Sequence, residues 1–140
     1  MTSIAVEIST EASPSAVWDA IRAIGALHTR LVPGFVVATE LVPGGRRVTF
    51  ANGMTVVEAI VSMNDALHRL VWTTNGSSSG LIHHNSAVQV YPREAGGCRV
   101  VWMTDVLPDD AANRIGAMMR QGATAMTSAF MRLSKEVAQL

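Results

Sequence analysis

The sequence has little cysteine, little charge and few aromatic residues. Its single cysteine, Cys98, cannot form an internal disulfide, and no spacing of Cys and His resembles a zinc site. Charged residues make up only 16% of the 140 residues and the formal net charge is zero. The chain therefore lacks the electrostatic footprint that binds nucleic acid or an anionic membrane surface. We expect no nucleic acid, membrane, metal ion or cofactor among its partners.

Long apolar runs and a leader segment are also missing. No run approaches the roughly 18 apolar residues that a membrane-spanning helix needs. Residues Met1 to Ser9 lack the basic start and apolar core of a signal peptide, so a cytoplasmic location is expected. Hydrophobic residues nevertheless make up 49% of the chain, which is long enough to bury a full core. We expect one domain covering residues 1–140.

The first third of the chain predicts one strand followed by two short helices. Apolar and polar residues alternate over residues 3–9, which is typical of a half-buried strand. Ser13 and Pro14 are typical of a helix N-cap and first helical position, and Gly25 ends this helix. A second short helix is expected at about residues 26–31.

The middle of the chain predicts an antiparallel meander. Its strongest hairpin signal is Asn52-Gly53. Short turn signals separate six expected strands, at Phe35–Val42, Arg46–Ala51, Met54–Met63, His68–Thr74, His83–Tyr91 and Cys98–Val106.

The last part of the chain predicts one long amphipathic helix. Apolar residues recur at steps of three and four from Ile115 to Val137. About 28 helical residues would span about 40 Å, at 1.5 Å per residue. A small core can cover such a helix only if the sheet curls around it.

This order of elements resembles the helix-grip fold of the START-like, or SRPBCC, superfamily, over essentially the whole chain. The superfamily includes polyketide cyclase/dehydrase-like proteins, lipid-transfer domains and plant hormone receptors. The local matches are Ser13-Pro14 with Val17-Trp18, Asn52-Gly53 followed by Val56, Glu58 and Ile60, Asp65 and Arg69 before Leu70-Val71-Trp72, and Val101-Trp102. The resemblance implies an α+β fold: a curved seven-stranded antiparallel sheet, two short helices and a long C-terminal helix over a cavity. Its members differ in activity, so the fold leaves the chemistry open.

Strand alternation predicts which side chains face that cavity. If Arg47, Arg69, Gln89 and Arg99 face water, then their immediate neighbours face inward. This inward set comprises Val48, Phe50, Asn52, His68, Leu70, Trp72, Thr74, His84, Ser86, Val88, Val90, Val100, Trp102 and Thr104. Alternation is ambiguous for the strand at Met54–Met63, where resemblance to the hormone receptors places Glu58 inward with Met54, Val56 and Ile60. The predicted ligand contacts are Phe50, Asn52, Val56, Ile60, Trp72, Ser86, Val88, Trp102, Thr104, Met119, Met126 and Phe130.

Glu58 and His84 are the candidate catalytic residues. A carboxylate in an apolar cavity, or a histidine near neutral pH, can move protons. The alternatives are that Glu58 pairs with a nearby arginine at the rim or faces outward, and that His84 is hydrogen-bonded to backbone at the mouth. His83 and His84 point to opposite faces of a strand, so they cannot easily share a metal ion.

Three functions remain open. The first is binding of a small hydrophobic molecule, such as a polycyclic or lipid-like compound, as carrier or sensor. The second is a cyclase/dehydrase-like enzyme in which Glu58 and His84 transfer protons. The third is a protein-interaction module. The apolar-rich composition is also compatible with a homodimer.

Overall fold

The structure is a computed structural model that describes residues 1–75 and 80–138. The predicted order of elements is confirmed. In chain order these are β1 (Thr2–Thr10), α1 (Pro14–Arg22), the short helices η1 (Ile24–Ala26) and η2 (Leu27–Leu31), β2 (Val36–Val42), β3 (Gly45–Phe50), β4 (Thr55–Asn64), β5 (Arg69–Asn75), β6 (His83–Pro92), β7 (Cys98–Leu107), η4 (Asp109–Ala111) and α2 (Ala112–Ala138).

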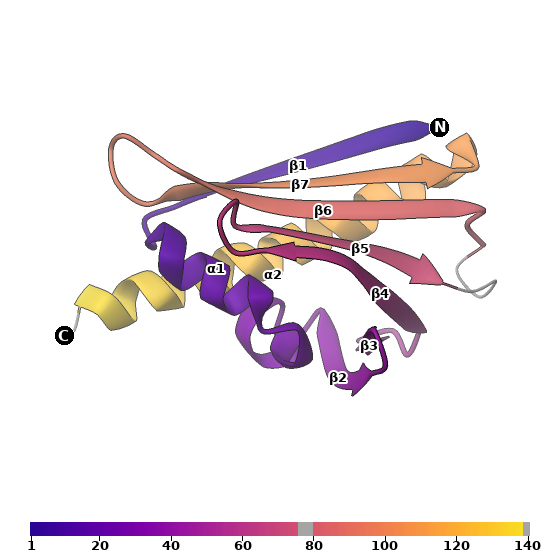
Figure 1. Cartoon of the computed structure of the whole chain (residues 1–140), viewed down its shortest axis with the longest axis horizontal. Helices are drawn as coiled ribbons and strands as arrows, with labels where there is room; N and C mark the ends of the chain where they lie inside the picture. Colours follow the sequence, from indigo (N-terminus) through magenta and orange to yellow (C-terminus); the bar gives the residue numbers. More distant parts are fainter. Residues whose placement is uncertain (76–79, 139–140) are drawn as a thin grey trace.

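The seven strands form one antiparallel sheet in the order β1-β7-β6-β5-β4-β3-β2. The first and last strands of the chain are neighbours, with Thr2 opposite Val106 and Thr10 opposite Cys98. Figure 1 shows α2 running behind the bent sheet, with α1 below the strands. The α+β helix-grip architecture predicted from the sequence is therefore confirmed.

Alternation along the strands separates an inner face from an outer one, as predicted. On β7, Val100 and Thr104 are buried, whereas Arg99 and Met103 are exposed. On β6, Ser86 and Val88 are only 1% exposed. The inner face therefore supplies side chains both to the core and to any space left between sheet and helix.

Side chains cap the start of helix α1 and anchor the helix to the sheet. The Ala16 N–H donates to Ser13 Oγ at 3.2 Å, and Pro14 occupies the first turn. On its other side, Trp18 Nε1 and Arg22 Nε each donate to Asp65 Oδ1 at 2.9 Å. The turn between β4 and β5 thereby holds α1 against the sheet.

Helix α2 covers the inner face, and its glycines let it approach closely. Met119, Met126 and Phe130 are at most 3% exposed. A Cβ atom on Gly122 would lie only 3.0 Å from Cζ3 of Trp102, so the absence of a side chain there makes room for the indole. Among the described residues, no helix is long and apolar enough to cross a membrane.

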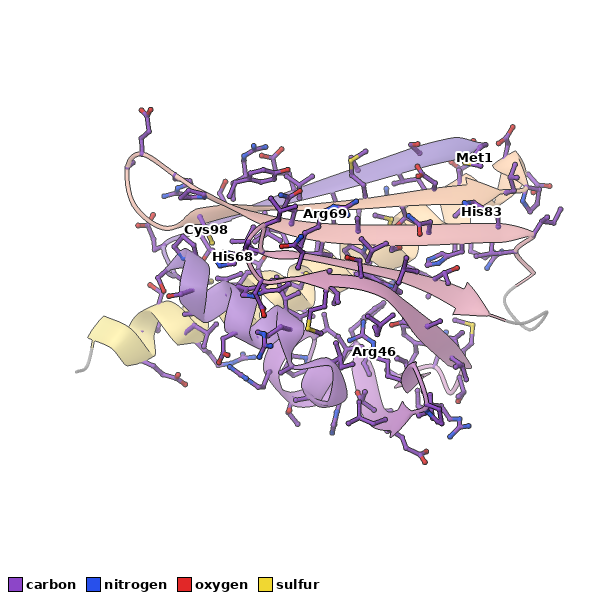
Figure 2. The ribbon with its side chains drawn as sticks, in the orientation of Figure 1. Met1, Arg46, His68, Arg69, His83 and Cys98 are labelled. Atoms are coloured by element: carbon purple, nitrogen blue, oxygen red, sulfur yellow. The ribbon has the colours of Figure 1, made fainter. Side chains whose placement is uncertain are left out.

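Two predicted inward positions lie outside the strands, and one of them, Asn52, is wrong. Asn52 is exposed in the turn after β3, because β3 ends at Phe50, and its Oδ1 accepts the Met54 N–H at 2.9 Å. His68 precedes β5 with φ of 50° and stacks on Trp18 with ring centroids 5.5 Å apart. In Figure 2, His68 and His83 lie toward opposite ends of the sheet.

A bulge in β4 explains where its inward alternation ends. The pairing with β5 shifts between Ile60 and Ser62, and Val61 is 59% exposed. A bulge of this kind reverses the facing of the residues beyond it. Met54, Val56 and Glu58 therefore share the inner face, as predicted from the resemblance, but the residues after Ile60 do not continue it.

Candidate ligand-binding cavity

A cavity lies between the inner face of the sheet, the short helices and α2. Its volume is about 110 Å³. One water molecule needs about 10–15 Å³, so the cavity has room for a guest of several heavy atoms. Its apolar lining comprises Ile21, Leu27, Leu31, Val32, Phe35, Val36, Val48, Phe50, Met54, Val56, Leu70, Trp72, Leu81, Val88, Trp102, Ile115, Met118, Met119 and Met126.

Most of the predicted site residues are brought together around this cavity. Both catalytic candidates, Glu58 and His84, line it. The predicted ligand contacts that line it are Phe50, Val56, Trp72, Ser86, Val88, Trp102, Thr104, Met119 and Met126. Three predicted contacts lie elsewhere. Asn52 is in the exposed turn, Phe130 is fully buried in the core, and Ile60 packs against the core opposite Trp72.

Two cavity-lining arginines were missed from the sequence. Arg46 has the same alternation as Val48 and Phe50 on β3, so strand parity alone would have placed it inward. Arg114 is exposed on α2 and lines the cavity near Gly80. Its position at the start of the amphipathic helix was the only signal in the sequence.

Arg46 and Glu58 form an ion pair on the inner face. They stand directly opposite each other on β3 and β4, and Arg46 Nε donates to Glu58 Oε1 at 2.8 Å. The two residues are 2% and 7% exposed. The guanidinium also lies over the Trp72 ring, 5.6 Å from its centroid. The carboxylate is thus paired with an arginine, as one alternative proposed, but the pair is buried on the inner face of the sheet.

His84 is held by a backbone donor. Its Nδ1 accepts the Thr74 N–H at 3.0 Å, so the proton of the neutral ring is on Nε2. That nitrogen lies 3.2 Å from Ser86 Oγ, which in turn lies 2.7 Å from Thr104 Oγ1. Burial, and secondarily the neighbouring His83, lowers the pKa of His84 to about 4. The ring is therefore neutral near pH 7 and acts as a hydrogen-bond donor at Nε2.

These polar groups form a band across the apolar inner face. Glu58 is opposite Thr74 on β5, and Ser86 is opposite Thr104 on β7. Together with the Thr74–His84 hydrogen bond, these pairs link β3 to β7. Small-molecule sites are usually apolar cavities that contain a few oriented polar groups.

Two indoles form the apolar wall beside this band. The rings of Trp72 and Trp102 lie 6.3 Å apart and are inclined by 40°. Trp102 reaches across to α2 at Gly122, so it spans the space between sheet and helix. Among the described residues, its buried Nε1–H has no hydrogen-bond acceptor.

Among the described charged residues that line the cavity, Arg114 is the one whose charge is not compensated by a neighbour. The Arg46 and Glu58 charges compensate each other, and His84 is neutral. Within the described part of the chain, Arg114 has no ion pair or hydrogen bond. No cluster of three or more His, Cys, Asp or Glu side chains suited to a metal ion occurs within residues 1–75 and 80–138.

Comparison with known protein families shows which family the chain belongs to. The family described as "Polyketide cyclase / dehydrase and lipid transport" matches residues 1–138. The chain belongs to this family. This membership confirms the resemblance to the START-like superfamily that the sequence suggested. Among curated proteins, none matches it by sequence.

Solved structures share the fold of this family member at low sequence identity. The protein XoxI from Bacillus cereus is 20% identical, with a TM-score of 0.84 over 95% of this chain and 98% of that one. The Zhui aromatase/cyclase from Streptomyces sp. R1128 is 13% identical, with a TM-score of 0.76 over 96% and 93%. A norcoclaurine synthase from Thalictrum is 18% identical, with a TM-score of 0.67 over 94% of each chain. At these identities, the likeness establishes the fold alone.

Proposed function

We propose that this chain binds one small, largely apolar molecule in the cavity between sheet and α2, as a carrier or sensor that leaves the molecule unchanged. The observation that carries this proposal is an apolar cavity whose two candidate proton-transfer groups already have protein partners. Glu58 is paired with Arg46, and His84 accepts a backbone N–H. The family description includes lipid transport, which fits such a role.

Apolar contact supplies the affinity in this proposal. Burying apolar ligand surface contributes roughly 25 cal/mol per Å². Trp72, Trp102 and Phe50 provide flat surfaces for a ring, and Met118, Met119 and Met126 provide side chains that adapt to its outline. The ligand class is therefore a compact molecule with at least one ring or an equivalent branched apolar body.

A cyclase-like enzyme is the second candidate, since the family description also includes cyclase and dehydrase activity. Proton transfer would need a free base near pH 7. His84 has its Nδ1 lone pair engaged and a pKa of about 4, which makes it a weak base there. Glu58 is the counter-charge of the buried guanidinium of Arg46, and neutralising it would leave that guanidinium unpaired. These costs favour binding over proton transfer.

Probe binding to two tryptophan variants of α2 tests the proposal. N-phenyl-1-naphthylamine is an uncharged apolar dye whose fluorescence rises when it leaves water. Met118 lines the cavity, whereas Met131 is 53% exposed on the same helix. We expect the dye to bind the unmodified chain and the Met131→Trp variant alike, and Met118→Trp to weaken binding at least tenfold by filling the space. Equal binding to both variants would place the dye outside the cavity and contradict the proposal.

A further inference from the structure

The hydrogen-bonding cluster of His84, Ser86 and Thr104 has one donor more than it can use internally. The backbone N–H of Thr74 occupies His84 Nδ1, which fixes the proton on Nε2. Nε2–H then donates to Ser86 Oγ at 3.2 Å. The low pKa of His84, about 4, agrees with a neutral ring.

The remaining hydrogen bond joins the two hydroxyls. Ser86 Oγ and Thr104 Oγ1 are 2.7 Å apart, and either can donate to the other. If Ser86 donates, the Thr104 proton is left over, and if Thr104 donates, the Ser86 proton is left over. In both arrangements one hydroxyl proton has no acceptor among the described residues. Ser86 and Thr104 are each 1% exposed, and both line the cavity.

We propose that this spare hydroxyl proton binds an uncharged oxygen acceptor of the ligand, such as a ketone or ether oxygen. This inference rests on the proposed function, and it adds the polar group that the apolar guest must carry. A buried donor without an acceptor is costly, so an occupant that supplies one is preferred over its hydrocarbon equivalent. The indoles of Trp72 and Trp102 lie beside the hydroxyls, since Trp72 is opposite Ser86 and Thr104 is two residues from Trp102. A ring on the indoles therefore presents its oxygen to the hydroxyl pair.

The number of hydroxyl donors left in each variant predicts that single and double substitutions have different effects on the preference for a carbonyl. In Thr104→Val, the Ser86 hydroxyl no longer has Thr104 as an acceptor and becomes the spare donor, so a donor remains in nearly the same place. In Ser86→Ala with Thr104→Val, both hydroxyls are gone. The donors that then remain are Nε2–H of His84, which had donated to the Ser86 oxygen at 3.2 Å, and the buried Nε1–H of Trp102, and neither occupies the position of the lost hydroxyls. The single variant should keep most of the preference, and the double variant should lose it.

1-Indanone and indane are matched probes, because they differ only in a carbonyl replacing a methylene. The measurement is the ratio of their dissociation constants for the unmodified chain, Thr104→Ser, Thr104→Val and the double variant, by calorimetry or ligand-observed NMR. We expect the ratio favouring 1-indanone to be similar in the first three proteins and to fall about two- to tenfold in the double variant, the usual effect of one hydrogen bond. An unchanged ratio in the double variant, with both probes still bound, would overturn the inference and leave the proposed function standing. If the unmodified chain binds neither probe, the proposed function fails and the inference with it.

A second readout needs no substitution and covers the case of a double variant that does not fold. The carbonyl stretching frequency of bound 1-indanone, measured by infrared difference spectroscopy, reports hydrogen bonding directly. We expect it to be lower than the frequency in hexane, because a donated hydrogen bond weakens the C=O bond. A frequency equal to that in hexane would show a carbonyl without a donor and would overturn the inference.

Discussion

Arg46 and Glu58 face each other across β3 and β4 and close an ion pair of 2.8 Å on the inner face of the sheet. Taking two charges out of water is costly, and only their mutual attraction and hydrogen bonding offset that cost. The pair therefore occupies the wall of an apolar cavity without adding net charge to it. It also engages Oε1 of the carboxylate that the sequence marked as a candidate acid or base.

The first prediction concerns the stability of this pair. Glu58→Leu leaves the buried guanidinium of Arg46 without its partner and should lower the free energy of unfolding by about 3–5 kcal/mol, whereas replacing both, by Arg46→Met with Glu58→Leu, should cost far less. The measurement is denaturant unfolding at pH 7.

An exposed pair on the neighbouring strands provides the control. Arg47 Nη1 and Glu40 Oε2 are 2.9 Å apart, with side chains 45% and 68% exposed. Glu40→Leu should cost less than about 1 kcal/mol, since water screens an exposed pair. Similar losses for Glu58→Leu and Glu40→Leu would show that the inner pair is not buried in solution.

The second prediction concerns the pH dependence given by His84. Its pKa is about 4 in the folded chain, against the usual 6.5 of an exposed histidine. The unfolded chain therefore binds more protons between these values, and stability falls as the pH drops from 6.5 to 4. The loss should reach about 2–3 kcal/mol, from 1.36 kcal/mol per pKa unit.

Two measurements check this prediction. An NMR titration should show the His84 ring protons shifting with a midpoint near pH 4. Unfolding free energies at pH 7 and pH 4.5 should differ less in His84→Phe, which has no titrating group, than in the unmodified chain. A His84 midpoint near 6.5 would mean that the ring is not buried in solution as it is in the structure.

The third prediction concerns Arg114 at the mouth. The dye 1-anilinonaphthalene-8-sulfonate is N-phenyl-1-naphthylamine with a sulfonate added, so the two dyes compare an anionic with a neutral guest. Arg114→Gln should weaken binding of the sulfonate up to about fivefold and leave the neutral dye unchanged, as expected for one exposed charge pair. The difference should shrink in 1 M salt, where the Debye length is about 3 Å.

Arg120 is the matched control, because it is exposed on α2 but does not line the cavity. Arg120→Gln should leave the affinity of both dyes unchanged. An equal loss of sulfonate binding in the Arg114 and Arg120 variants would mean that the anion senses only the overall charge of the helix.

The fourth prediction compares two glycines of α2. Alanine in place of a helical glycine usually adds about 1 kcal/mol of stability. A Cβ on Gly116 meets the end of the flexible Arg120 side chain at 3.3 Å and Cγ2 of Ile4 at an ordinary contact distance of 3.7 Å, whereas one on Gly122 meets the Trp102 ring at 3.0 Å and Phe35 at 3.3 Å. Gly116→Ala should therefore stabilise the chain. Gly122→Ala should gain nothing, and should displace Trp102 and weaken dye binding. Equal stabilisation by both, with unchanged tryptophan fluorescence, would show that Trp102 does not rest on the helix.

The sequence predicted the fold well because its signals are local. Alternation, turn residues such as Asn52-Gly53 and helical periodicity each act over a few residues, and their order matches one architecture. Strand parity also placed Ser86, Trp102 and Thr104 on the inner face. The prediction failed where a strand ended: Asn52 lies beyond the end of β3 and is exposed.

The partners of the candidate catalytic residues could not be predicted in the same way. The pairing of Glu58 with Arg46 depends on the register between β3 and β4, which is set by the whole hairpin. The acceptor role of His84 Nδ1 depends on the backbone of a neighbouring strand. Both facts change the chemistry, because each turns a candidate acid or base into a group that is already engaged.

A crystal structure of the chain with bound N-phenyl-1-naphthylamine tests the central claim most directly. The account predicts one dye molecule per chain, in contact with Trp72, Trp102 and Met118 beneath α2. The contrary result would be a cavity filled by these same side chains, with the dye absent or on the outer surface.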